Sequence, residues 1–276
     1  MSATLASARP AVQSGAELAA TARHIREQTL WLSVDQPHHL GGQLSCVEML
    51  VAVLYGHAPR FPDTRFVLSK GHACITLYAI LADQGRIDRA DLTTMMKFGG
   101  RLLGHPCRTT TPAIDVSTGS LGQGLSVAVG MADAARRQGL DTRVYVVLGD
   151  GEMQSGQVWE ALMFLGQHGL DNLRILIDSN GGQADGAVDG IVSLEPLANR
   201  LESFGLDVTE CDGHDLDALM AALDRGRPGR TPVTVARTVK GKGVSFMEGD
   251  HSWHSGSLSA GQLRLALADT GCVGKP

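Results

Sequence analysis

Two short polar motifs follow apolar stretches of the sequence and contain residues that could bind a metal ion and a phosphate group. The first is Gly-Asp-Gly at positions 149–151, and the second is Asp-Ser-Asn-Gly-Gly at 178–182. Asp150 and Asn180 are thirty positions apart, about the length of one strand–helix–strand unit. Two adjacent parallel strands would then present a carboxylate and an amide oxygen side by side, and such hard oxygen ligands suit Mg²⁺. The flanking glycines would let diphosphate oxygens approach the backbone.

Either motif alone is a weak signal. Gly-Asp-Gly could be an ordinary turn, and Asn180 could cap a helix. The two motifs at this spacing, each closing an apolar strand, favour a joint site for a metal ion and a diphosphate.

Histidines form a second candidate group. The chain has ten, and four lie in expected loops near glycine: His39, His72, His105 and His254. Imidazole exchanges protons near neutral pH, so these four suit proton transfer to and from carbonyl and hydroxyl oxygens. A histidine metal site is the alternative, but no His-x-x-x-His pair supports it. We assign no role to His24, His57, His168 and His214.

The elements that would position these residues alternate along the chain. Strands are expected at 65–69, 143–150, 173–179, 206–210 and 232–238. Helices are expected at 15–34, 46–56, 73–85, 121–139, 158–169, 194–204, 215–226 and 259–269, with a short one after Asp88. Near-continuous apolar strands separated by helices predict a doubly wound α/β fold, a mostly parallel sheet with helices on both faces.

Local signals set several expected boundaries. Gly41-Gly42 should end the first helical region, and Ser45 should cap the next helix. The stretches 99–120 and 241–256 are rich in Gly and His and predict long functional loops. We expect residues 1–14 to be a flexible tail and 15–276 to be a single domain.

Composition excludes several classes of protein. The 276 residues are 43% hydrophobic with a net charge of −5, so the chain can bury a core and lacks the basic surface of a nucleic-acid binder. No apolar run approaches a membrane span, and the N-terminus does not resemble a secretory signal. The five cysteines are scattered, without a Cys-x-x-Cys pair, which favours a reducing cytoplasm.

Six blocks carry a resemblance to a known family. The Gly-Asp-Gly motif followed by Asn180 resembles the thiamine diphosphate motif. The other blocks resemble the N-terminal part of transketolases, most closely the split, two-gene enzymes: HLGGQLSCVEML, DTRFVLSKGHACITLYAIL, LGHPC, DVSTGSLGQGLSVAVGMA and TVKGKGVSFMEGDHSWH. The resemblance covers most of the chain and implies the thiamine diphosphate-binding fold of that family.

This resemblance implies a role for each matching residue. Asp150 and Asn180 match side-chain ligands of Mg²⁺, with Ca²⁺ or Mn²⁺ as alternatives, and the carbonyl of Gly182 is the expected third ligand. Residues expected to contact the cofactor are His72, Gly119, Leu121, Gly149, Asp150, Gly151, Asp178, Asn180 and His254. Residues expected to act on the substrate are His39, His105 and His254.

The implied activity is transfer of a two-carbon ketol unit from a ketose (phosphate) donor to an aldehyde acceptor. The glutamate that activates the cofactor belongs, in the family, to a pyrimidine-binding domain that this sequence does not include. The resemblance therefore implies a C-terminal partner subunit, an α2β2 assembly, sugar-type substrates, and no nucleic-acid or membrane partner. The alternatives are an α-type subunit of a 2-oxo acid dehydrogenase or a carrier-loading relative, and a non-catalytic scaffold.

Two positions depart from the family pattern. Ser155 stands where family members have a glutamate that links the two active sites, and Glu152 nearby could partly replace it. Around the first histidine, Pro37-His38-His39-Leu40 replaces the family's smaller Ser-Gly-His-Pro, which suggests an altered donor or acceptor.

Overall fold

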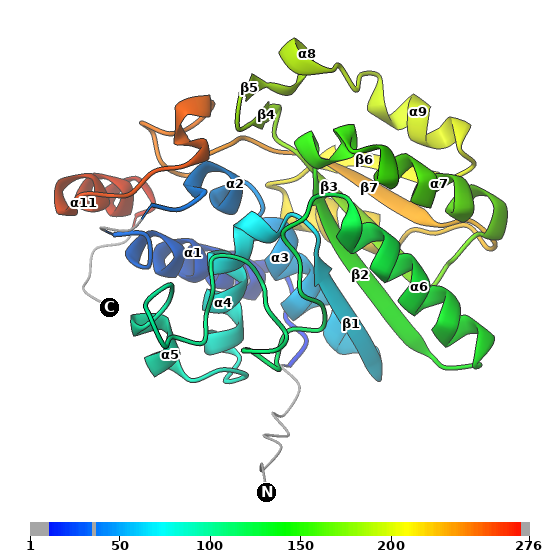
Figure 1. The fold of residues 1–276 in the computed structure, drawn as a ribbon, viewed down its shortest axis with the longest axis horizontal. Helices are drawn as coiled ribbons and strands as arrows, with labels where there is room; N and C mark the ends of the chain where they lie inside the picture. The colour runs from blue at the N-terminus through cyan, green and yellow to red at the C-terminus, as the bar shows by residue number, and fades with distance from the viewer. Residues whose placement is uncertain (1–10, 35–36, 272–276) are drawn as a thin grey trace, which may run out of the picture.

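A five-stranded parallel sheet forms the centre of the molecule in the computed structural model, which describes residues 11–34 and 37–271 (Figure 1). The strand order is β1-β2-β3-β7-β6. The bounds are β1 Asp63–Leu68, β2 Thr142–Gly149, β3 Leu173–Ser179, β6 Asp207–Asp212 and β7 Pro232–Arg237. A separate two-stranded antiparallel hairpin, β4 (Gly182–Gln183) and β5 (Gly186–Ala187), follows β3. The predicted doubly wound α/β class is confirmed.

Alternating apolar side chains divide the core into two layers. Val144, Val146 and Leu148 of β2 pack with one group of helices, and Tyr145 and Val147 with the other. The first group is α6 (Gln123–Arg137), α7 (Gly156–His168) and α9 (Leu197–Ser203). The second is α1 (Gly15–Trp31), α3 (Val47–Val51), α4 (Cys74–Asp83) and α10 (Leu216–Asp224). Figure 1 shows α6 and α7 over one face and α1, α3 and α4 on the other side.

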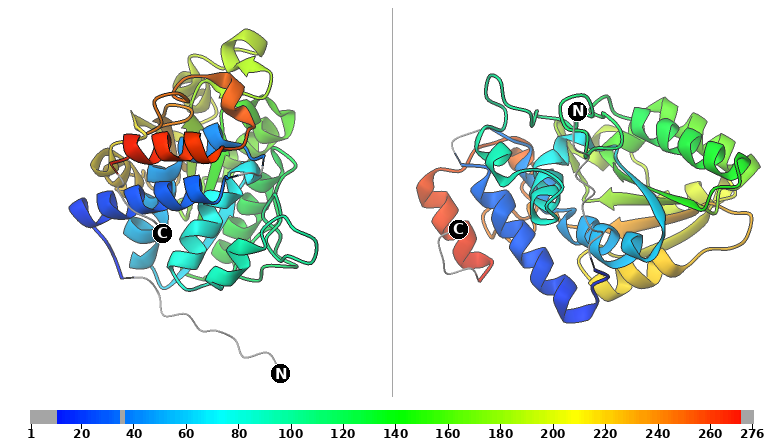
Figure 2. Two further views of the ribbon diagram at one scale, coloured as in Figure 1. Left: turned by 90° about the vertical axis from the view of Figure 1, so that its left-hand side faces the viewer. Right: turned by 90° about the horizontal axis from the view of Figure 1, so that it is seen from below.

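The C-terminal part of the chain packs back onto its beginning. Helix α11 (Ala260–Asp269) lies beside α1 in both views of Figure 2. Leu263 and Leu267 of α11 join Leu30 and Leu40 in a third apolar cluster. The remaining short elements are α2 (Leu40–Leu44), π-helix η1 (Ala52–His57), η2 (Ala58–Arg60), η3 (Gly71–Ala73), α5 (Arg89–Thr93), η4 (Gly151–Gln154), α8 (Val188–Ile191) and η5 (His251–His254).

Two boundary expectations are wrong. Gly41 and Gly42 do not interrupt helical structure, because both lie inside α2. Their lack of a side chain serves close packing instead: a Cβ on Gly41 would lie 2.8 Å from Cγ of Lys240. Ser45 does not cap the following helix, whose N-cap is Cys46, because its hydroxyl donates to Asp178 instead. Asp88, by contrast, caps α5 as expected, accepting from the backbone N–H of Ala90.

Two long connections lie next to the candidate site. Residues 94–122 link α5 to α6, and residues 238–250 link β7 to η5, so both predicted loops are confirmed apart from the short η5. The predicted tail falls mostly on residues outside the described ranges; within it, the backbone N–H of Gln13 donates to the carbonyl of Tyr55 at 2.9 Å. Cys46, Cys74, Cys107 and Cys211 are free thiols, and Cys272 lies outside the described residues.

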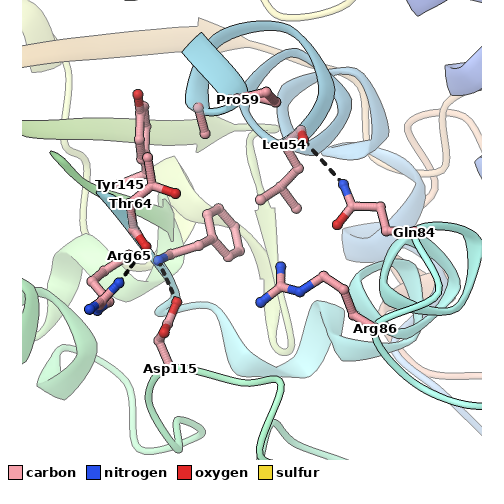
Figure 3. A pocket seen from close by; sticks show the side chains of 10 residues that line it. Leu54, Pro59, Thr64, Arg65, Gln84, Arg86, Asp115 and Tyr145 are labelled. Atoms are coloured by element: carbon pink, nitrogen blue, oxygen red, sulfur yellow. Dashed lines mark hydrogen bonds between the residues drawn. The ribbon is translucent and has the colours of Figure 1, made fainter. Parts of the chain in front are cut away.

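The edge strand β1 is covered by the first long connection. The carboxylate of Asp115 accepts a hydrogen bond from the backbone N–H of Phe66 at 2.9 Å, which occupies an edge donor. Arg86 points into the adjoining cavity of about 250 Å³ (Figure 3). The residues predicted for the functional site lie elsewhere. In the described part of the chain, no helix is both long and apolar enough to cross a membrane.

We predict that the start of α6 tolerates no side chain at Gly124. A Cβ there would lie 2.4 Å from the Ser69 hydroxyl and 2.8 Å from its Cα, so Gly124→Ala should destabilise the fold by about 1–3 kcal/mol through overpacking. Gly130 on the same helix has nothing within 4 Å of its Cβ position, and Gly130→Ala should stabilise by about 0.5–1 kcal/mol. Urea unfolding of the two variants measures both effects, and equal midpoints would contradict the packing described here.

Candidate functional site

Most of the sequence-predicted residues line one cavity at the carboxyl ends of the strands, whereas His39, His105, Gly119 and Asp178 do not line it. This cavity has a volume of about 80 Å³. Predicted residues that line it are His72, Leu121, Gly149, Asp150, Gly151, Asn180, Gly182 and His254. The parallel register places Gly149 of β2 opposite Asp178 of β3, which brings the two motifs together as their spacing predicted.

A buried ion pair underlies this cavity. The ammonium group of Lys70 donates to the carboxylate of Asp178, and both side chains are almost fully buried. Burial alone would lower the pKa of Lys70 and raise that of Asp178. The pair nevertheless stays ionised, because each charge shifts the pKa of its partner the opposite way. Asp178 also accepts from Ser45 at 2.7 Å, from Asn180 at 3.0 Å and from Thr238. Both of its oxygens are thus engaged within the chain.

Among the described residues, the carboxylate of Asp150 accepts hydrogen bonds from backbone N–H groups rather than from a cationic side chain. Its Oδ1 accepts from the backbone N–H of Gly151 at 2.8 Å, and its Oδ2 from that of Gly181 at 2.6 Å. Burial, with the nearby charge of Asp178, raises the pKa of Asp150 to about 6 despite these hydrogen bonds. A buried carboxylate held in this way favours a neighbouring cation.

A lysine ammonium occupies the other side of the same space. Lys240 is 1% exposed, and its Nζ donates to the carbonyl of Gly182 and to Nδ1 of His254, each at 3.0 Å. Burial, with the charge of Lys70, lowers the pKa of Lys240 to about 8. Nearby, the amide oxygen of Asn180 accepts from the N–H of Gly182 at 3.0 Å.

This donor set fits a hard divalent cation next to a phosphate. Asp150, Asn180 and Gly182 offer a carboxylate, an amide and a carbonyl oxygen, which are oxygen ligands only. The Lys240 ammonium on the Gly182 carbonyl marks a place where the chain itself presents a positive charge. Within residues 11–34 and 37–271, no group of three or more His, Cys, Asp or Glu side chains is arranged to hold a metal. The structure thus lends no support to the alternative of a histidine metal site.

The four predicted histidines form a cluster beside the cavity. The ring centroid of His39 lies 5.3 Å from that of His72, 6.2 Å from His105 and 5.2 Å from His254. Burial lowers the pKa of His39, lowers that of His72 strongly, and brings that of His254 to about 4; neighbouring positive charges add to each shift. These three imidazoles are therefore neutral near pH 7, and a ring nitrogen of each can accept a hydrogen bond.

The loop before α6 closes one side of the cavity. Gly119 lies against His105, whose Cδ2 would be 3.0 Å from an added Cβ, and Leu121 is 43% exposed. Glu152 accepts from the backbone N–H of Gly122 at 2.8 Å and from the hydroxyl of Ser69. The carboxylate of Glu152 is thus committed to holding this loop, whereas Ser155 lies at the start of α7.

Sequence reasoning did not assign four polar residues of this site. Lys70 and Lys240 belong to the quoted Ser-Lys-Gly-His and Lys-Gly-Lys-Gly blocks, and both lysines are buried. A lysine next to glycine within such a block is a sequence signal that could have indicated them. Ser45 and Thr238 carry no local motif, because their role lies in contacts to Asp178, which is 133 and 60 positions away, respectively.

Comparison with known proteins gives consistent matches. A family model described as "Transketolase, thiamine diphosphate binding domain" matches residues 52–273. The chain is 36% identical to one subunit of the apulose-4-phosphate transketolase of Actinobacillus succinogenes, over 92% of this chain and 95% of that protein. It is 40% identical to 6-deoxy-6-sulfo-D-fructose transketolase subunit SqwG of a Clostridium species, over 84% and 87%.

Solved structures extend the match to the fold. The transketolase of Leishmania mexicana superposes with a TM-score of 0.83 at 27% identity. The match covers 95% of this chain but only 42% of that one. The chain thus spans less than half of the solved transketolase and nearly all of the curated relative from Actinobacillus.

We predict that the buried ion pair is essential to the fold. Asp178→Asn should destabilise the chain by about 3–5 kcal/mol, because it leaves the Lys70 ammonium buried without a counter-charge. The double variant Lys70→Met/Asp178→Asn should recover part of that loss, since it removes both charges. Guanidinium unfolding measures this, and a double variant less stable than the sum of its single changes would contradict the pairing.

We also predict that His254 stays neutral well below pH 6. In the unfolded chain a histidine titrates near pH 6.5, whereas the pKa of His254 in the folded chain is about 4. Between these values the unfolded chain binds more protons, so this histidine makes the fold less stable as the pH falls from 6.5 to 4. NMR titration of its ring proton, assigned with His254→Gln, should show no midpoint above pH 5. A midpoint at 6 or higher would disagree with the burial described.

Proposed function

Because the chain belongs to the transketolase family, we propose that it is the diphosphate-binding subunit of a two-subunit, thiamine diphosphate- and Mg²⁺-dependent transketolase. The observation that carries this proposal is the convergence of Asp150, Asn180 and Gly182 on one cavity with Lys240. Two relatives are themselves named as transketolase subunits, and this chain matches them over most of their length, which supports the two-subunit form.

Residues of the strand ends would hold the cofactor. When bound, thiamine diphosphate supplies a nucleophilic thiazolium carbon for breaking and forming C–C bonds. Asp150 and Asn180, with the carbonyl of Gly182, would hold Mg²⁺, with Ca²⁺ or Mn²⁺ as alternatives, against the diphosphate. Lys240 and His72 would contribute charge and hydrogen bonds to the same group. Asp178, whose oxygens are engaged within the chain, would position these residues rather than donate a free lone pair.

The remaining wall of the cavity would receive the ring system of the cofactor. Gly149, Gly151 and Leu121 line the cavity. Leu121, with Gly119 of the same loop, would contact the aminopyrimidine. The exposed fraction of Leu121 fits a surface that a ligand or a second chain would cover.

The histidine cluster would act on the substrate. His39, His105 and His254 lie within one group of rings. Imidazoles there could bind the hydroxyl and carbonyl oxygens of a ketose donor and take or return protons during ketol transfer. The named relatives act on sugar-type ketoses, which supports a donor of this class.

We propose a second subunit that carries the pyrimidine-binding domain and the activating glutamate, in an α2β2 assembly in the cytoplasm. The match covers 42% of the solved transketolase from Leishmania mexicana, which leaves room in that enzyme for a part of the site that a partner would supply here. Residues 15–276 would form one domain. A 2-oxo acid dehydrogenase subunit is not favoured, since the relatives are transketolase subunits. A non-catalytic scaffold, suggested by Ser155, would not need Asp150 or the histidine cluster.

Cofactor binding tests the metal site. Asp150→Ala removes the one charged ligand and should weaken thiamine diphosphate binding with Mg²⁺ by about 10²-fold or more, measured by isothermal titration calorimetry with the partner present. Glu160→Ala, which removes an exposed carboxylate from helix α7, is the control and should bind normally. Unchanged affinity in Asp150→Ala would contradict the assignment of Asp150 as a metal ligand.

The chain without its partner should be inactive. Under this proposal the activating glutamate belongs to the partner, so C2–H exchange of the cofactor bound to this chain alone, followed by NMR in D2O, should match that of free cofactor. Addition of the partner should restore exchange and ketol transfer. Robust transfer by this chain alone would refute the two-subunit proposal.

A further inference from the structure

A charged network lies behind the cavity, on the far side of the segment that carries Lys240. Arg26 of α1 donates to both carboxylate oxygens of Glu48 of α3, at 2.6 and 2.9 Å. His214, in the turn before α10, places Nδ1 3.1 Å from the same carboxylate. Arg26 is 8% exposed and Glu48 7% exposed. None of the three lines the candidate cofactor cavity, and sequence analysis gave His214 no role.

Hydrogen-bond direction fixes how this network is protonated. Nε2 of His214 accepts from the backbone N–H of Val239 at 2.9 Å, since an amide nitrogen can only donate. The ring proton of neutral His214 must therefore lie on Nδ1 and point to Glu48. Burial would raise the pKa of Glu48, but the hydrogen bond from His214 and the charge of Arg26 hold it below its usual value. The carboxylate is thus an acceptor on both sides.

The same network holds the segment on both sides of Lys240. His214 binds the amide of Val239, just before it, and Nε of Arg26 donates to the carbonyl of Lys242, just after it, at 3.1 Å. Gly243 adopts φ +89°, and a Cβ there would lie 2.8 Å from Cδ of Arg26, so the segment runs close along the guanidinium group. Two anchors therefore flank the one residue whose side chain crosses to Gly182 and His254.

We propose that Arg26, Glu48 and His214 are positioning residues that fix residues 239–242 so that Lys240 reaches the diphosphate site. This inference rests on the proposed function, because it assigns Lys240 to the diphosphate. The network acts through backbone hydrogen bonds alone and touches neither cofactor nor substrate. Helices α1 and α3 and the turn before α10 thereby help to set the geometry of a cavity that they do not line.

A cavity of about 250 Å³ next to the network makes the proposal testable without overpacking. Arg26, Glu48, His214 and Gly243 line it. Side chains of similar size can therefore be exchanged at position 48 with room to adjust. The effect of changing the hydrogen-bonding groups at position 48 can thus be examined without a change of side-chain volume.

Glu48→Gln is the critical variant. Its amide replaces one of the two oxygens by an NH2 group, so either Arg26 or the Nδ1–H of His214 meets an N–H group. His214 can avoid that conflict only by moving its proton to Nε2, which then opposes the N–H of Val239. In the chain without cofactor, backbone hydrogen–deuterium exchange in residues 238–243 should rise about tenfold or more.

His57→Gln is the matched control. His57 is also buried and bridges Tyr145, at 2.7 Å, and Asp224 at the other end of α10, at 3.3 Å. It should leave exchange in residues 238–243 unchanged. Unchanged exchange in Glu48→Gln would overturn the proposal, because it would mean that the network does not hold residues 238–243. Faster exchange spread over the whole chain would also overturn it, because that is a general loss of stability.

A double-mutant cycle tests delivery of Lys240. With the partner present, thiamine diphosphate affinity with Mg²⁺ should fall about tenfold in Glu48→Gln and at least as much in Lys240→Met, and the double variant should equal Lys240→Met alone. Additive losses, or normal affinity in Glu48→Gln despite faster exchange, would overturn the proposal. If the wild-type protein binds no thiamine diphosphate, the proposed function fails and delivery to a diphosphate fails with it. In that case, hydrogen exchange in Glu48→Gln would still show whether the network holds residues 238–243.

Discussion

The ion pair between Lys70 and Asp178 is the constraint on which the site depends. Two charges taken out of water need close partners, because desolvation costs several kcal/mol per ion. Lys70 follows β1, Asp178 ends β3, Thr238 follows β7 and Ser45 follows α2, and all meet at one carboxylate. The requirement to satisfy that carboxylate therefore fixes the strand ends and α2 relative to one another. It also explains why Ser45 lies in the core of the site instead of capping a helix.

Asp178 neutralises Lys70, but the neighbouring Asp150 and Lys240 do not form an ion pair with each other. Asp150 accepts only backbone N–H groups, and its pKa rises to about 6, while Lys240 places its ammonium on a carbonyl and a histidine. A divalent cation beside Asp150 and a diphosphate beside Lys240 would complement both. The histidines next to them, neutral near pH 7 in the cases of His39 and His254, add ring nitrogens that can accept hydrogen bonds.

Much of this arrangement follows from the sequence. The apolar runs ending at Gly149 and Ser179 predicted adjacent parallel strands, and the thirty-residue spacing of Asp150 and Asn180 predicted their meeting. Helix α2 could not be predicted from the sequence, because two consecutive glycines usually break a helix. The close approach of Lys240 to Gly41 and of His72 to Gly42 explains why glycine stands at both positions. The contacts of Ser45, Glu48 and His214 could not be predicted either, since each joins positions far apart that share no periodic pattern. Assignment of cofactor and substrate contacts came from family resemblance, not from spacing.

A crystal structure of the protein with thiamine diphosphate and Mn²⁺ would test the central claim most directly. We expect an anomalous peak for the metal about 2.2 Å from oxygens of Asp150, Asn180 and Gly182, with the diphosphate on its open side. The ammonium of Lys240 should then have left the carbonyl of Gly182 and moved to a phosphate oxygen. A metal bound elsewhere, or Lys240 still on Gly182 in the presence of bound cofactor, would contradict the account.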